Sequence, residues 1–261
     1  MSRASTSWVR LPPKIRHEVL SILPGLGGRC SLLATVSQEW HAVIEPLNFA
    51  EISLTPPCLS NPDSAAILFR KRSQIRHIWF CVELQQYNCG RCLPKNQEHW
   101  GLDDADNRLI TDAFQSLFST SSKWEPRNNL VLDISVYSCD TRHWFKYLSF
   151  HPDTRLGKSS SLQRSRDELG TPIDDPTHGW VAGQQKFPLN EHAIEKVFNE
   201  IMAEGPFEDE EPEMQWWQTL PLVPAVAVGL LRQQTRRCWK PVALANILTR
   251  FPNMKELCYE P

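Results

Sequence analysis

The sequence lacks an apolar run long enough to cross a bilayer. Its longest one, Leu220 to Leu231, is interrupted by two prolines, whereas a membrane-spanning helix needs about 20 apolar residues. The first residues also lack the continuous apolar segment of a secretory signal peptide. We therefore expect an intracellular protein, cytoplasmic or nuclear, that does not bind a membrane.

An excess of charge of one sign is also missing. The 28 Lys and Arg residues nearly balance the 30 Asp and Glu residues, which gives a formal net charge of −2. A protein that binds nucleic acid through its overall field carries a clear positive excess, so the composition argues against nucleic acid as a partner. With 261 residues, of which 41% are hydrophobic, the chain can form one or two domains with a real core.

Closely paired cysteines are nearly absent. The 8 cysteines are scattered at irregular spacing, which favours reduced thiols over a disulfide framework. Cys89 and Cys92 have the spacing of a zinc or redox site. Cys81 and His99 lie nearby, but no second close pair follows, so we predict no metal site. A Cys-dependent metal or redox protein stays open as a third function.

No catalytic constellation stands out either. The glycine-rich segment 25–28 lacks the Lys-Ser/Thr ending of a phosphate-binding loop and fits a turn between helices better. His143, His178 and His192 have no nearby nucleophile in a recognisable pattern, and the chain has no Gly-x-Ser-x-Gly elbow. We therefore expect a protein that is not an enzyme and that binds no cofactor.

The N-terminal fifth of the chain carries the most informative pattern. Leu11-Pro12-Pro13 presets a helix start, and Pro24-Gly25 ends that helix after Leu23. A second helix is expected from Ser31, as its N-cap, to Leu47. Both helices carry apolar residues at helical spacing. Because fewer than fifty residues bury too little surface for comfortable stability, the remaining apolar face should contact a partner.

This segment resembles an F-box, with Leu-Pro-x-x-Ile at its start and Leu-Leu-Ala-x-Val-Ser-x-x-Trp in its second half. In that family the segment binds a Skp-type adaptor and, through it, a cullin of a ubiquitin ligase. The resemblance covers residues 5–50 and implies a substrate-recognition subunit that holds a still unknown protein substrate. The residues that match the motif, and that the resemblance assigns to adaptor binding or to the small core, are Leu11, Pro12, Ile15, Val19, Leu23, Leu33, Val36 and Trp40.

The segment departs from the family pattern at two places. Lys14 stands where the family usually has an acidic residue, and the glycine-rich segment 25–28 replaces a short acidic or polar turn. Both departures bear on adaptor binding. The alternative function is a protein-interaction scaffold that acts outside any ligase.

After a linker at residues 51–74, the chain alternates strand and helix patterns. Apolar residues at every second position predict strands at 76–84 and 130–136. Between them, apolar residues at i, i+3, i+4, i+7 and i+8 predict a helix from Asp103 or Asp106 to Phe118. Further helices are expected at 190–204 and 241–250. Such an order of elements predicts an α/β or α+β fold with a parallel sheet.

The region 75–261 also carries a weak repeat. Ile75-x-x-Ile78-x-Phe80 and the segment 254–259 share the strand spacing of a leucine-rich repeat. Because F-box proteins often carry such repeats, the resemblance implies an irregular leucine-rich-repeat-like, substrate-binding domain; the alternative is a non-repetitive α/β domain. The chain stops after a strand-like segment with no polar capping unit, which indicates a shortened relative of a longer repeat protein with an exposed edge.

Three surface features complete the sequence picture. The polar stretch 151–185 has no apolar period and is predicted to be a mobile loop. The acidic run 208–211 and the basic clusters around 70–72 and 236–240 either recognise a charged or phosphorylated target or are scattered surface charge. In the neighbouring Trp216-Trp217 pair, one indole is a candidate partner contact.

Overall fold

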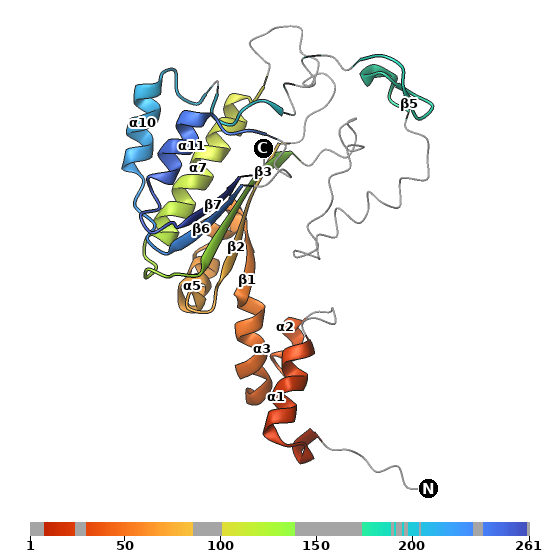
Figure 1. Cartoon of the computed structure of the whole chain (residues 1–261), viewed down its shortest axis with the longest axis vertical. Helices are drawn as coiled ribbons and strands as arrows, with labels where there is room; N and C mark the ends of the chain where they lie inside the picture. The colour runs from red at the N-terminus through yellow and green to blue at the C-terminus, as the bar shows by residue number, and fades with distance from the viewer. Residues whose placement is uncertain are drawn as a thin grey trace.

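The computed structural model describes residues 8–23, 30–85, 101–138, 174–188, 191, 195, 198–203, 205–231 and 237–259. Within them a five-stranded parallel sheet carries helices on one face, and a small helical unit projects from one end of the sheet (Figure 1). The expected mixed α/β class with a parallel sheet is confirmed. None of the described helices is long and apolar enough to cross a membrane.

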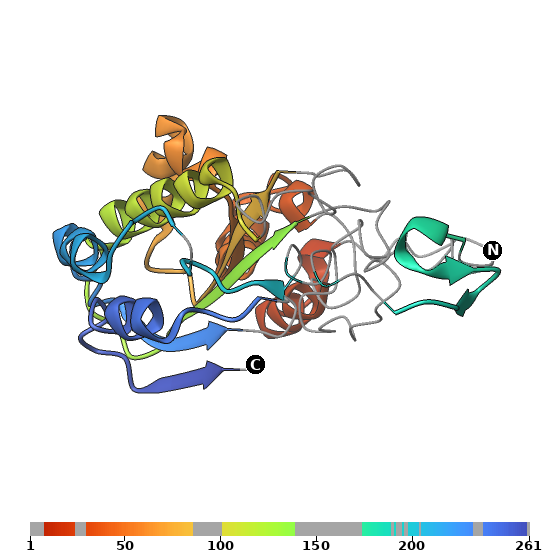
Figure 2. The same cartoon turned by 90° about the horizontal axis from the view of Figure 1, so that it is seen from above.

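The strands lie side by side in chain order, and every neighbouring pair is parallel. They are β1 (Glu51–Leu54), β2 (His77–Leu84), β3 (Leu130–Ser138), β6 (Val226–Leu231) and β7 (Glu256–Tyr259). Right-handed crossovers between successive neighbours place every connecting helix on the same side of a sheet. The described helices of this region accordingly lie on one face, as Figure 2 shows from above.

Each of these helices lies in a connection between two successive strands of the sheet. They are α4 (Pro56–Ser60), α5 (Pro62–Lys71), α7 (Asp104–Ser121), α10 (Glu210–Thr219) and α11 (Pro241–Leu248). The longest, α7, starts where the Asp103 side chain accepts a hydrogen bond from the Asp106 amide at 2.9 Å. Acidic residues at this end also suit the helix dipole. The predicted helix from Asp103 to Phe118 is confirmed and continues to Ser121.

The core between sheet and helices is centred on Phe114 of α7, which is fully buried. Its ring centroid lies 5.7 Å from Phe80, 6.3 Å from Phe118, 5.9 Å from Trp217 and 5.4 Å from Trp239. Such edge-on and tilted aromatic contacts add to the free energy gained from burial. The core therefore joins β2, α7, α10 and the segment before α11 in one cluster.

Part of the basic cluster at 236–240 has an internal role. Lys240 Nζ lies 3.0 Å from Oε2 of Glu213, which is buried in α10 and also accepts a 3.4 Å hydrogen bond from Trp217 Nε1. Arg237 is buried too and donates to the Asn199 carbonyl at 3.2 Å. These two cations hold neighbouring segments together. They are therefore bound within the protein and do not form a surface site for a phosphorylated target.

Residues 51–74, predicted to be a linker, instead form β1, α4 and α5 of the sheet region. Ile52 and Leu54 of β1 stand in register with Ile78 and Phe80 of β2. The strand has four residues and follows the helix α3 (Gln38–Ala50) directly. For this reason the sequence shows neither a turn before β1 nor a long alternation of apolar and polar residues within it.

The prediction of a helix over 190–204 fails at its C-terminal end. Residues 191, 195 and 198 are helical, and the residues between them lie outside the described part of the chain. Ile201 instead forms an isolated β-bridge with Trp239, and Met202 has a positive φ of 63°. The backbone bridge to Trp239 competes with the helix for the hydrogen bonds of this segment.

The predicted mobile loop at 151–185 differs from the structure where the chain is described. Residues 151–173 lie outside the described part. The remainder forms the short helix η7 (Pro176–His178) and the hairpin of β4 (Trp180–Val181) and β5 (Gln184–Gln185). His178 is buried there, and its Nδ1 lies 2.9 Å from Asp175 Oδ2. The segment is thus held by a polar contact between neighbouring residues. Such a contact leaves no apolar period in the sequence, so the prediction missed it.

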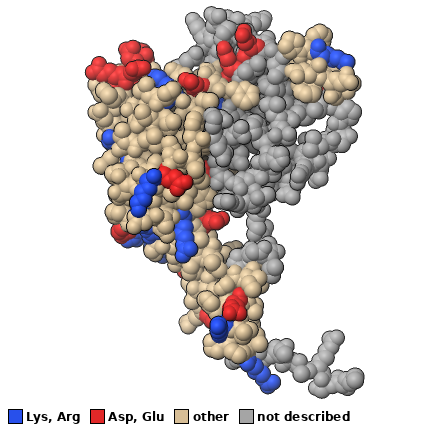
Figure 3. All heavy atoms as spheres, in the orientation of Figure 1, with Lys and Arg blue, Asp and Glu red and all other residues tan. Residues whose placement is uncertain are grey.

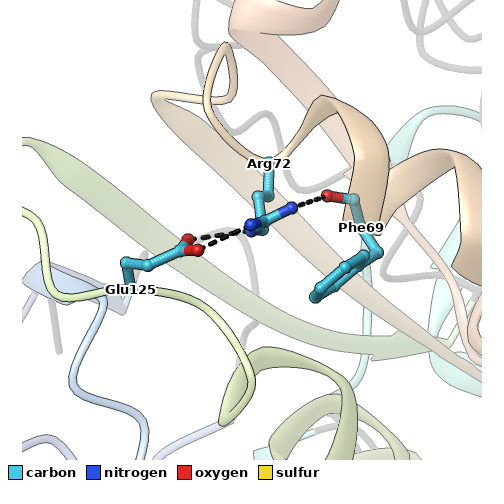
Figure 4. A network of polar contacts seen from close by, with 3 residues as sticks. All are labelled: Phe69, Arg72 and Glu125. Carbon is cyan, nitrogen blue, oxygen red and sulfur yellow. Dashed lines mark hydrogen bonds and ion pairs between the residues drawn. The ribbon is translucent and has the colours of Figure 1, made fainter.

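Arg72, at the end of α5, is bound to the loop before β3 (Figure 4). Its Nε and Nη2 donate to the two carboxylate oxygens of Glu125 at 2.8 and 2.6 Å, and Nη1 donates to the Phe69 carbonyl at 2.6 Å. The guanidinium also lies 4.1 Å from the Phe69 ring centroid. The bidentate geometry that could read a phosphate is thus used within the protein.

This contact predicts an unusual titration of Glu125. The hydrogen bonds from Arg72 are the largest cause that lowers the pKa of Glu125, to about 2. Because the folded pKa is below the unfolded one, the stabilising contribution is complete above the ordinary pKa of 4.5 and is lost as the pH falls toward about 2. Carboxyl NMR should therefore show that Glu125 is still ionised at pH values where glutamates without a cationic partner are half protonated.

Two variants test the cause of this shift. Arg72→Ala should return the titration of Glu125 toward the ordinary glutamate range. Lys123→Ala, which removes an exposed cation from the same loop, should leave it low. An unshifted Glu125 in the wild-type protein, or equal titrations in both variants, would contradict the assignment of the effect to Arg72.

Candidate functional site

The N-terminal unit, residues 8–23 and 30–50, contains three α-helices rather than the predicted two. They are α1 (Pro13–Ile22), α2 (Cys30–Leu33) and α3, preceded by the short helix η1 (Trp8–Arg10). Ser37 rather than Ser31 caps α3, because its Oγ accepts the Trp40 amide at 3.3 Å. The Thr35 hydroxyl closes the turn before it by donating to the Leu32 carbonyl at 2.9 Å. The expected helix from Ser31 to Leu47 is therefore split.

The unit has a small core of its own. Leu20 of α1 and Ile44 of α3 are fully buried. At the start of the unit, the Trp8 and Trp40 ring centroids are 5.3 Å apart. Glu39 then accepts a hydrogen bond from Trp8 Nε1 at 3.2 Å, and its other carboxylate oxygen lies 2.9 Å from Arg16 Nε in an ion pair. These contacts fix α1 against α3 and determine which side of α1 faces inward.

The motif residues divide between the inside and the surface of this unit. Half-buried side chains are those of Leu11, Leu23, Leu33 and Trp40; exposed ones are those of Pro12, Ile15, Val19 and Val36. The buried residue of α1, Leu20, was not among the predicted motif positions. It lies on the opposite side of the helix from Ile15 and was indistinguishable from it by apolar spacing alone.

One side of α1 presents a row of apolar side chains to the surface. Ile15, Val19 and Ile22, here called the α1 row, follow i, i+4 and i+7 and are 43, 37 and 60% exposed. Leu32 of α2 and Val36, which lies between α2 and α3, add two more exposed aliphatic side chains. Single exposed aliphatics are ordinary, but an aligned row on one helix is typical of a docking surface.

The face of the sheet opposite the helices is a second candidate. Its centre is polar: Trp79 Nε1 donates to Ser135 Oγ at 3.0 Å, and His77 Nε2 lies 3.6 Å from Oδ2 of the buried Asp133. The register of β2 and β3 places these four residues on one side. Asp133 and Ser135 are 0 and 2% exposed, whereas His77 and Trp79 are half-buried, so only His77 and Trp79 of these four reach the surface of this face.

The described residues contain no group of three or more His, Cys, Asp and Glu side chains that could hold a metal. Cys89, Cys92 and His99, the candidates from the sequence, lie outside the described residues. Cys81 is buried in β2, and this burial raises the pKa of its thiol to about 12. It is therefore protonated at neutral pH and a poor nucleophile or ligand.

The acidic run 208–211 leads into α10 and gathers at that end of the molecule (Figure 3). Acids in a first helical turn are stabilised by the helix dipole. Trp217 is buried and Trp216 half-buried, with the Trp216 ring centroid 5.5 Å from that of Phe207. Because the segment is helical rather than extended, both indoles pack against the protein.

Comparison with known proteins found no family model, no curated protein and no solved structure that matches the chain. The case for a function therefore depends on the residues of the chain and on their arrangement.

Proposed function

We propose that this chain is the substrate-recognition subunit of a Skp–cullin–F-box type ubiquitin ligase. The observation that carries the proposal is the α1 row, which lies within a segment that resembles an F-box and leaves Ile15, Val19 and Ile22 exposed. Burying one aliphatic side chain is worth about 1.5–3 kcal/mol. Because the three side chains are 37 to 60% exposed, completing their burial can supply about 2–4 kcal/mol of the free energy of a contact with the adaptor.

The sheet region, residues 51–259 where described, is the proposed substrate-binding part. Its strands follow one another in order, all parallel, with helices on one face. This arrangement supports an irregular leucine-rich-repeat-like domain, in which the face opposite the helices binds the partner. All four residues of the last described strand, β7, are exposed.

The mechanism is proximity rather than bond chemistry. The N-terminal unit holds the chain on the adaptor and cullin, and the sheet region holds a protein substrate. Tethering raises the effective concentration of substrate lysines near the ubiquitin-carrying enzyme. The chain itself needs no cofactor or catalytic residue for this role.

Reconstitution from purified components tests the proposal. The full chain, a Skp-type adaptor and the N-terminal part of a cullin are mixed in pairs and all together, and each mixture is separated by size-exclusion chromatography. The chain should elute with the cullin only when the adaptor is present. Elution with the cullin in the absence of the adaptor, or failure to join either protein while remaining folded, would contradict the proposal and favour a scaffold outside the ligase.

A further inference from the structure

The N-terminal unit meets the sheet without a spacer. The helix α3 ends at Ala50, and the first residue of β1 is Glu51, which has extended backbone angles of φ −128° and ψ 119°. Figure 1 shows α3 leading straight into β1. The direction of the whole unit relative to the sheet therefore depends on this single junction and on the contacts beside it.

Several contacts hold the last turns of α3 against elements of the sheet region. Lys71, the last residue of α5, places its Nζ 2.6 Å from Glu45 Oε2 and 5.8 Å from the ring centroid of Phe49. The Arg76 amide, just before β2, donates to the Ala50 carbonyl at 2.8 Å. The Gln74 side chain also hydrogen-bonds Glu45, but among the described residues of the sheet region only Lys71 forms an ion pair with it, and Arg76 binds the backbone at the junction itself.

The pair of Lys71 and Glu45 is well shielded for a surface ion pair. The Lys71 and Glu45 side chains are 25 and 19% exposed, and Lys71 Nζ lies 5.8 Å from the centroid of the Phe49 ring. The hydrogen bond from Lys71 is the largest cause that lowers the pKa of Glu45, so the carboxylate is ionised at neutral pH. Lys71 is thus committed to α3 rather than to an external phosphate.

We infer that Lys71 is a positioning residue that fixes the angle between the N-terminal unit and the sheet region. Its significance for ubiquitin transfer rests on the proposed function, because a fixed angle would set the distance from bound substrate to the ligase. Without Lys71, the α1 row and the core around Phe114 keep their own contacts. The unit can then swing about the Ala50–Glu51 junction.

Distance measurements between the two parts test this inference on the full chain. Spin labels carried by genetically encoded amino acids are placed at Ser21 on α1 and Gln115 on α7, both exposed, which leaves the native cysteines unchanged. Double electron–electron resonance should give one narrow distance peak for the wild-type chain. Lys71→Ala should lose that peak to a broad distribution while the thermal unfolding midpoint changes little.

Matched variants separate positioning from general stability. Lys71→Arg and the swapped pair Glu45→Lys with Lys71→Glu should restore a narrow peak, because each keeps an ion pair in place. Arg70→Ala, which removes the neighbouring exposed cation of α5, should behave like the wild-type chain. A narrow peak in Lys71→Ala, or no recovery in both restored pairs, would overturn the inference. If Lys71→Ala gives the broad distribution but the wild-type chain binds no adaptor, the proposed function alone is refuted.

Discussion

Replacing Phe114 by alanine is expected to lower the free energy of unfolding by about 3–5 kcal/mol, the range measured for large buried aromatics. Phe114 is fully buried, and its ring contacts four aromatic rings from β2, α7, α10 and the segment before α11. Those elements are fixed by their own backbone bonds and cannot close the cavity. The substitution therefore loses both transfer free energy and ring contacts.

Urea unfolding followed by circular dichroism measures this loss. The control is Phe187→Ala, in which the same side chain is removed from a position that is 66% exposed. Its effect should stay within about 0.5 kcal/mol of zero, as for most surface substitutions. Similar losses in the two variants would mean that the aromatic cluster is not the centre of the core.

The double variant Ile15→Asp with Val19→Asp is expected to weaken adaptor binding by at least about tenfold. Ile15 and Val19 are 43 and 37% exposed in the free chain, so completing their burial contributes about 1–2 kcal/mol together, and each 1.4 kcal/mol is a factor of ten in affinity. Burying the two new carboxylates would cost more. Both positions are exposed in the free chain, so the fold should be retained.

A charge placed elsewhere provides the matched control for this variant. Ile67 of α5 is 39% exposed, close to the 37% of Val19, but belongs to the sheet region. Ile67→Asp should bind the adaptor as the wild-type chain does, in a calorimetric or biolayer titration with circular dichroism to verify folding. Equal losses in the two variants would place the docking surface somewhere other than the α1 row.

The strongest helix could be predicted because its pattern is long and one-sided. The segment from Asp103 to Phe118 repeats its apolar spacing over several turns, and the side chains of Ile110, Ala113, Phe114, Leu117 and Phe118 are all buried. The strands β2 and β3 were equally predictable from alternation. By contrast, β1 has four residues and adjoins α3 without a turn, so its only signal is its pairing with β2, which is a tertiary contact.

The candidate site shows a different limit of sequence patterns. The helix α1 has apolar residues on two sides, and spacing alone does not say whether Leu20 or Ile15 faces inward. Contacts from the Trp8–Trp40 pair and the burial of Ile44 settle it. Similarly, Ser31 and Ser37 are both good N-caps, and the turn closed by Thr35 selects the second. Such choices are made by neighbours that are distant in sequence.

Charged residues that looked like recognition clusters were the least predictable. Lys71, Arg72 and Lys240 each contact a carboxylate from another element. Their partners, Glu45, Glu125 and Glu213, are separated from them by 26 to 53 residues. No local pattern can show such pairs, because they exist only once the helices are packed.

The most direct test of the central claim is a calorimetric titration of the purified full chain with a Skp-type adaptor at several temperatures. The account predicts one-to-one binding in the micromolar range or tighter, with a negative heat-capacity change, because apolar surface of the α1 row is removed from water. A folded chain that shows no heat of binding at any of these temperatures and does not co-elute with the adaptor would contradict it.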